Sequence, residues 1–219
     1  MAQRRLLDIS LAATLTALVL LVAAVMAAAT ASPPASQELF ETISAPADYA
    51  ARLVATDAGL RVVLFIDGLF MLAYTTAIGF AALAFRDNNR PAAWLAGCGI
   101  VVVMILDALE NTTMAGSLDI AGLTGALTLE RIATQASISA MKWQIAAATL
   151  VATSFVLPSA TLLEKLLVWG VRLGLPVAVP LFVYDPFGLR AVGGILLLVS
   201  MAGGFVLLAI VLRGRMRQA

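Results

Sequence analysis

Histidine is absent from this sequence of 219 residues, and cysteine occurs once, as Cys98. Without histidine there can be no histidine-ligated zinc or haem site, no Ser-His or Cys-His nucleophile pair and no histidine pH switch. A single cysteine excludes an intrachain disulfide and any site that needs several cysteines around a metal. We therefore expect no metal, no cofactor and no catalytic residue of these kinds. Any chemistry has to use carboxylates, lysine, tyrosine or the backbone.

Charge is also scarce, since 12% of the residues are charged and 62% are hydrophobic. A soluble globular domain has about 25% charged residues, roughly twice this share. The net charge is +1 and basic residues gather only in short loop clusters, which argues against a nucleic-acid partner. The composition predicts an all-α polytopic integral membrane protein whose surroundings are the lipid bilayer.

Six apolar stretches are long enough to cross a hydrocarbon core of about 30 Å, which takes about 20 helical residues. They predict one transmembrane domain over residues 1–219, with spans at about 11–30, 59–85, 92–114, 136–157, 162–184 and 189–212. Residues 31–58 are predicted to be a partly helical external loop, because residues 36–41 and 44–48 have helix-start patterns. Its apolar side chains would lie on the membrane surface or cap the bundle; they are Leu39, Phe40, Ile43, Tyr49 and Leu53.

The distribution of lysine and arginine predicts that both ends of the chain lie in the cytoplasm. This orientation places most basic residues inside: Arg4, Arg5, Arg86, Arg90, Lys165, Arg172, Arg213, Arg215 and Arg217. It leaves few outside: Arg52, Arg61, Arg131 and Arg190. The pattern is that of a multi-pass protein of a bacterial cytoplasmic (inner) membrane.

Two of the six predicted spans have alternatives. The first resembles a secretory signal, with Arg4 and Arg5 before the apolar run and an A-x-A pattern at residues 29–31. Its apolar run is longer than that of most signals; cleavage would leave five spans and an external N-terminus. The fifth contains Pro176 and Pro180, which predict a kink. Without the fifth span the basic C-terminal tail would lie outside, so we expect a kinked span rather than none.

Four ionisable residues fall well inside the predicted spans, where each costs about 2.5–3.5 kcal/mol on insertion scales. They are Asp67, Asp107, Glu110 and Lys142. At a rise of about 1.5 Å per residue, all four lie in the outer third of the bilayer. This shared depth predicts a polar site below the outer surface.

Helical spacing adds neighbours to this predicted site. Asn111 shares one face of the third span with Asp107 and Glu110, and Tyr74 shares a face of the second with Asp67. Arg131, Gln135, Ser139 and Lys142 fall within about 80° on the fourth. We expect Asp67, Asp107, Glu110, Asn111 and Lys142 to form a ligand or ion site, with Tyr74, Arg131 and Gln135 in support.

Three hypotheses follow. In the first, three carboxylates facing Lys142 leave an excess of acid that a proton, a cation or an amine would satisfy, as in a small carrier or ligand-binding membrane protein. In the second, the same charges hold helices or a partner span together in an accessory subunit. Separately, four glycines of the sixth predicted span are most simply close-packing surfaces, and the alternative is contact with a homo-oligomer or membrane partner; they are Gly193, Gly194, Gly203 and Gly204. In the third, an Asp/Glu pair acts as acid and base on a lipid. The third has least support, because the sequence has no metal, nucleophile or phosphate-binding motif.

Overall fold

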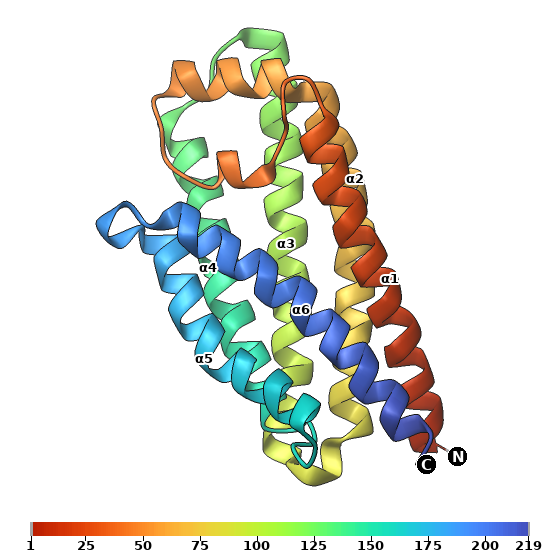
Figure 1. Cartoon of the computed structure of the whole chain (residues 1–219). Coiled ribbons are helices and arrows are strands. Elements are labelled where there is room, and N and C mark those ends of the chain that lie inside the picture. Colours follow the sequence, from red (N-terminus) through yellow and green to blue (C-terminus); the bar gives the residue numbers. More distant parts are fainter. Residues whose placement is uncertain (1, 219) are drawn as a thin grey trace. The chain divides into compact units, whose positions relative to one another are not determined.

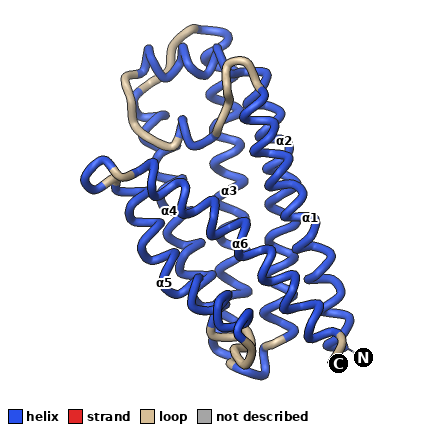
Figure 2. The backbone as a smooth tube through the Cα atoms, in the orientation of Figure 1, coloured by secondary structure: helices blue, strands red, loops and turns tan. Residues whose placement is uncertain are grey.

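The computed structural model describes residues 2–218, and this part of the chain is helical almost throughout, with no strand (Figure 2). Its six α-helices are α1 (Ala2–Thr30), α2 (Pro46–Ala84), α3 (Arg90–Thr124), α4 (Leu129–Ser154), α5 (Leu162–Tyr184) and α6 (Arg190–Met216) (Figure 1). Three short 3₁₀ turns lie between them: η1 (Gln37–Phe40), η2 (Arg86–Asn88) and η3 (Pro186–Gly188). The all-helical prediction is confirmed for the residues described.

Five of the helices, α1, α2, α3, α5 and α6, are long and apolar enough to cross a membrane. Length and composition are therefore those of a multi-pass membrane protein. The fourth predicted span corresponds to α4, which is a continuous helix of 26 residues but carries a stripe of polar side chains. The number of crossings and the orientation of the chain stay predictions.

Local signals account for where the helices begin and end. The α5 helix starts with a capping box, in which Thr161 accepts from the Glu164 amide and Glu164 accepts from the Thr161 amide. Asn89 Oδ1 accepts from the Ala92 amide at the start of α3. The end of α3 is followed by Gly125, whose φ of +68° is the left-handed conformation that glycine adopts at low cost.

The loop between α1 and α2 differs in one respect from the prediction. A short helix forms at η1, within the predicted residues 36–41. The second predicted loop helix is not separate, because α2 begins at Pro46 and continues for 39 residues. No proline follows Pro46 in this helix, so nothing in it breaks the backbone hydrogen-bond ladder.

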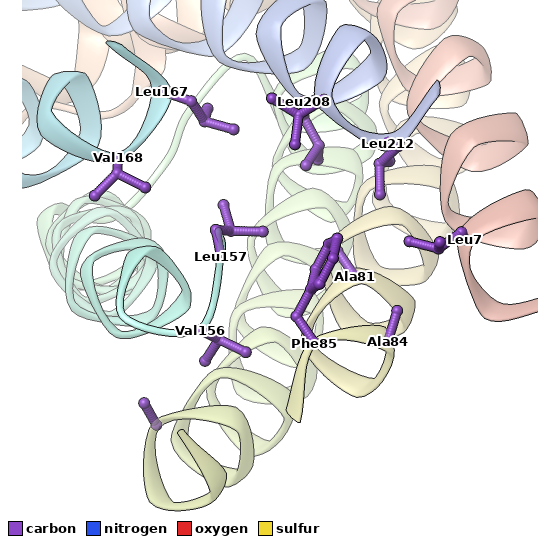
Figure 3. Close-up of a cluster of buried hydrophobic side chains, with 12 residues drawn as sticks. Leu7, Ala81, Ala84, Phe85, Val156, Leu157, Leu167, Val168, Leu208 and Leu212 are labelled. Atoms are coloured by element: carbon purple, nitrogen blue, oxygen red, sulfur yellow. The ribbon is translucent and has the colours of Figure 1, made fainter. Parts of the chain in front are cut away.

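The chain divides into two compact units. Unit 1 comprises residues 1–19, 72–103 and 143–219, and unit 2 comprises residues 20–71 and 104–142. Unit 1 has a large apolar cluster (Figure 3) that contains Leu7, Ala81, Ala84, Phe85, Ala92, Val156, Leu157, Leu167, Val168, Leu208, Val211 and Leu212.

The members of this cluster come from alternate ends of all six helices. It unites the beginnings of α1, α3 and α5 with the ends of α2 and α6 and with Val156 and Leu157, which lie just beyond the end of α4. A polar contact adds to it, since Ser10 Oγ on α1 donates to the Ala77 carbonyl on α2 at 2.7 Å. Helices that are consecutive in the chain therefore run antiparallel to one another in unit 1.

Glycine brings α5 and α6 close together in unit 1. A Cβ atom on Gly193 would lie 2.6 Å from the backbone nitrogen of Phe182, so a larger residue does not fit there. A Cβ atom added at Gly194 would make ordinary contact with the Phe182 ring, whereas Gly203 and Gly204 have open space where a side chain would project. Close packing is thus the role of Gly193, and a role of these glycines toward a partner stays a prediction.

Unit 2 is built on a second apolar cluster beneath the loop. Its buried residues are Ala35, Phe40, Tyr49, Ala50, Leu53, Leu60, Met114, Leu118, Ala121, Leu127 and Ile132. Of the five loop residues expected to cover the membrane surface or the bundle, Phe40, Tyr49 and Leu53 are buried here, whereas Leu39 and Ile43 are exposed. The loop packs as a cap onto α3 and α4 of this unit.

Candidate functional site

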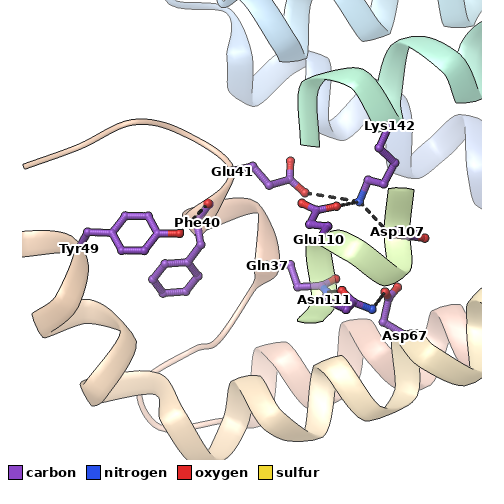
Figure 4. Close-up of polar contacts among 9 residues, drawn as sticks. All are labelled: Gln37, Phe40, Glu41, Tyr49, Asp67, Asp107, Glu110, Asn111 and Lys142. Carbon is purple, nitrogen blue, oxygen red and sulfur yellow. Dashed lines mark hydrogen bonds and ion pairs between the residues drawn. The ribbon is translucent and has the colours of Figure 1, made fainter. Parts of the chain in front are cut away.

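A buried ion-pair cluster lies in unit 2, around the side chain of Lys142 on α4 (Figure 4). Its Nζ atom pairs with Glu110, lies 3.1 Å from Oδ1 of Asp107 and lies 4.0 Å from Oε1 of Glu41. All four side chains are close to fully buried, with exposed fractions between 1% and 11%. Asp107 and Glu110 are one turn apart on α3, so both face the lysine from the same side.

Asp67 on α2 joins the cluster through a chain of hydrogen bonds (Figure 4). Asn111 Nδ2 donates to Asp67 Oδ2 at 2.7 Å, and Gln37 Nε2 in turn donates to Asn111 Oδ1 at 2.7 Å. Asn111 follows Glu110 on α3, so the two hydrogen-bonded systems lie side by side. The chain connects the loop, α3 and α2.

We refer to Glu41, Asp67, Asp107, Glu110 and Lys142 as the acidic cluster. Its four carboxylates carry three more formal charges than its one ammonium group. Burying a charge in a low-dielectric interior is costly unless the charge is paired. The composition of the cluster therefore favours the arrival of further positive charge.

The loop supplies two residues that sequence reasoning did not assign to the site, Gln37 and Glu41. They are four residues apart across η1; Gln37 points toward Asn111 of α3, and Glu41 points toward Lys142 of α4 (Figure 4). Phe40 lies between them in sequence and anchors the turn: Tyr49 Oη donates to the Phe40 carbonyl at 2.9 Å, and the two rings meet edge to face. Nothing local in the sequence indicated that Glu41 would face inward, because its partner is distant along the chain.

The polar stripe predicted on α4 extends from Lys142 toward the start of the helix. Arg131 donates from Nε to Ser117 Oγ at 2.8 Å and from Nη2 to the Thr113 carbonyl at 3.0 Å. Its guanidinium group lies against Gly116 of α3, where a Cβ atom would be 2.6 Å away. Arg131 therefore ties α4 to α3 at a second point.

Two further residues of this stripe, Gln135 and Ser139, are 1% exposed. The side-chain nitrogen and oxygen of Gln135 and the hydroxyl of Ser139 have no hydrogen-bond partner among the residues described. Buried polar groups in native proteins nearly always have a partner, so such groups call for an explanation.

The structure thus brings together most of the residues predicted for the site. Asp107, Glu110 and Lys142 are in direct contact, Asp67 and Asn111 are hydrogen bonded to each other, and Arg131 and Gln135 lie on the same face of α4. Tyr74, which was predicted in support of the site, is buried on α2 and belongs to unit 1.

The cluster consists of buried charged side chains held together by ion pairs. Among the residues described, no group of three or more acidic or cysteine side chains is arranged to hold a metal ion. Searches of known protein families, curated proteins and solved structures find no significant match to this chain. The class that the fold and the site define is a helical protein with membrane-length apolar helices and buried, ion-paired charges.

Proposed function

We propose that this chain is a multi-pass membrane protein that binds a small cation at the acidic cluster, as a carrier or a ligand-binding protein. The observation that carries the proposal is the surplus of buried carboxylate around Lys142. Ionisable residues within membrane helices are costly, and they commonly mark ion or substrate pathways. A proton, an alkali cation or an organic ammonium ion would each lower the net charge.

The proposal includes six crossings with both ends of the chain on the cytoplasmic side. The antiparallel arrangement of the helices in unit 1 supports an even number of crossings, with α4 as one of them. The same cluster supports a retained first helix, because Leu7 of α1 is buried among its residues. Basic residues next to this cluster, such as Arg86 and Arg215, fit a cytoplasmic position.

Two amide substitutions test the proposed function, Asp107→Asn and Glu110→Gln. The purified protein in detergent would be titrated calorimetrically with sodium, potassium and methylammonium chlorides at constant ionic strength, and proton uptake would be followed in weak buffer. We expect at least one of these cations to bind, and each variant to weaken its binding about tenfold or more. A hydrogen bond to a charged group contributes about 1.5–3 kcal/mol, and about 1.4 kcal/mol is a factor of ten.

Asp119→Asn is the matched control. Asp119 is also an α3 carboxylate in an ion pair, but its partner is Arg61 at an exposed position, with Nη2 and Oδ1 at 2.7 Å. This variant should bind the cation as the unaltered protein does. Unchanged binding in both Asp107→Asn and Glu110→Gln would refute the proposed function.

The second candidate function is an accessory subunit in which the cluster only holds helices together. It is favoured by one observation: Lys142 lies within ion-pairing reach of residues from α3 and from the loop. In this case the two amide variants would lower the melting temperature in detergent or lose a co-purifying partner, and no cation would bind to the unaltered protein.

A further inference from the structure

Three buried side chains at the contact of α3 and α4 have polar atoms that the protein's own described groups do not satisfy. They are Gln135 and Ser139 on α4 and Glu110 on α3, each 1% exposed. One oxygen of Glu110 pairs with Lys142, whereas its Oε1 atom has no hydrogen-bond partner. A buried polar group without a partner lowers the stability of the folded state by about 1–3 kcal/mol, so these groups together destabilise the protein unless a ligand or water satisfies them.

The contacts of Arg131 and Lys142 with α3 define the levels at which these three residues lie. Arg131, near the start of α4, contacts Thr113 and Ser117 of α3. Lys142, further along α4, contacts Asp107 and Glu110, which come earlier in α3. The two helices are therefore antiparallel. Gln135 and Ser139 lie between Arg131 and Lys142 on the same face of α4. They are therefore opposite residues 110–113 of α3. This turn lies between the Lys142 contact and the Arg131 contact, and Glu110 is its first residue.

The unsatisfied atoms are both donors and acceptors. Glu110 Oε1 and the side-chain oxygen of Gln135 accept hydrogen bonds, the Gln135 amide nitrogen donates, and the Ser139 hydroxyl can do either. Exchanging the oxygen and nitrogen of Gln135 does not alter this inventory, because both atoms lack partners. A bound molecule that satisfies all of these groups has to donate at least two hydrogen bonds and accept at least one.

This requirement discriminates among the cations that the acidic cluster could take. A proton would satisfy Glu110 alone. An alkali cation is coordinated by oxygen atoms and leaves the Gln135 amide nitrogen without an acceptor. A protonated amine donates several hydrogen bonds, and an adjacent hydroxyl or carbonyl oxygen would accept from Gln135 or Ser139.

We infer that the ligand is a compact protonated amine that carries a hydrogen-bond acceptor beside its ammonium group, held by Glu110, Gln135 and Ser139. The inference rests on the proposed function and adds the class of ligand to it. The ammonium group supplies the positive charge that the acidic cluster favours, and Gln135 with Ser139 determines the selectivity for the neighbouring oxygen.

Two matched amines test the inference. The full-length protein in detergent would be titrated by calorimetry with ethanolamine hydrochloride and with ethylamine hydrochloride at the same pH and ionic strength. They share the ammonium group and differ in the hydroxyl. We expect ethanolamine to bind about fivefold or more tightly, the effect of one net hydrogen bond of about 1 kcal/mol. In Gln135→Met, which keeps the shape of the side chain without its amide, the two affinities should become equal.

Gln144→Met is the control, because Gln144 is an exposed glutamine on the same helix whose oxygen accepts only a surface hydrogen bond from Tyr184. This variant should keep the preference for ethanolamine. If Gln135→Met is not recovered as folded protein, Ser139→Ala changes a single oxygen atom and should reduce the preference.

Each alternative outcome has a distinct meaning. Equal affinity for the two amines in the unaltered protein would overturn the inference. Binding of sodium, potassium or protons without binding of either amine would overturn it too, while leaving the proposed function in place. If neither amine binds and Gln135→Met lowers the melting temperature, internal water serves these polar atoms and the inference is wrong. Absence of binding by every cation would refute both proposals.

Discussion

Glu41, in the loop after α1, places its Oε1 atom 4.0 Å from Nζ of Lys142 on α4, and both side chains are buried. The loop is therefore part of the acidic cluster as well as its cover. Gln37, which precedes Glu41 by four residues, has its own hydrogen bond to Asn111 of α3. Any ligand that reaches the cluster from the side of the loop has to displace these two contacts.

Replacing Glu41 with Gln should weaken cation binding, because it removes one of the carboxylates that face Lys142. We expect a loss of several-fold, smaller than for Asp107→Asn, since the Glu41 contact is longer. Calorimetric titration measures the change. Glu38→Gln, at an exposed position of the same turn, is the control and should bind as the unaltered protein does. Equal cation affinities of the Glu41→Gln and Glu38→Gln variants would show that Glu41 does not contribute to cation binding.

Tyr49→Phe should loosen the loop while leaving the rest of unit 2 intact. The substitution removes the hydrogen bond to the Phe40 carbonyl and keeps the ring that packs on Phe40. The expected cost is about 1 kcal/mol. Hydrogen exchange followed by mass spectrometry should show faster exchange across residues 36–41. Tyr184→Phe changes a tyrosine at an exposed position and should leave exchange in this segment unaltered.

Lys142→Met should destabilise the protein more than Tyr49→Phe or either amide substitution on α3. It leaves buried carboxylates without the cation that pairs with them, and breaking a buried ion pair costs about 3–5 kcal/mol. A second substitution, Glu110→Gln, should restore part of the loss, because one uncompensated charge is then removed. Melting temperatures in detergent provide the measurement. Lys165→Met, at an exposed position, should have little effect, and an equally mild Lys142→Met would show that the ion pairs contribute little.

Gly193→Ala should lower stability by about 1–3 kcal/mol, because the added methyl group would meet the backbone of Phe182 and push α5 from α6. Gly203→Ala offers the opposite case on the same helix. A Cβ atom at Gly203 meets nothing within 4 Å, and alanine has the higher helix propensity. Thermal melts of the two variants should therefore move in opposite directions. A loss of stability in Gly203→Ala would instead indicate that this face packs against a partner.

Local periodicity was sufficient to predict which residues share a helix face. The spacing of Asp107, Glu110 and Asn111 placed them together. The stripe from Arg131 to Lys142 predicted the side of α4 that faces other helices, and the structure shows that this side meets α3. These features depend on helical geometry alone, which the sequence carries directly.

Contacts of the loop could not be predicted in the same way. Glu41 resembled the other acidic residues of an external segment, and its approach to Lys142 depends on Phe40 being anchored by Tyr49. The length of α2 was also misjudged, because the pattern at residues 44–48 starts a helix but does not specify where that helix stops. Long-range packing decides both features, and it leaves little trace in a short stretch of sequence.

The apolar cluster of unit 1 has a consequence for the synthesis of the protein. Leu7 belongs to α1, whereas Leu208 and Leu212, which share its cluster, belong to α6 (Figure 3). At a translation rate of about 5–20 residues per second, α1 is complete roughly 10–40 s before α6. During that interval Leu7 and its neighbours lack part of their final packing, and lipid or another protein has to cover them. The core of unit 1 therefore cannot close helix by helix as the chain grows, and its last step waits for α6 to emerge from the ribosome.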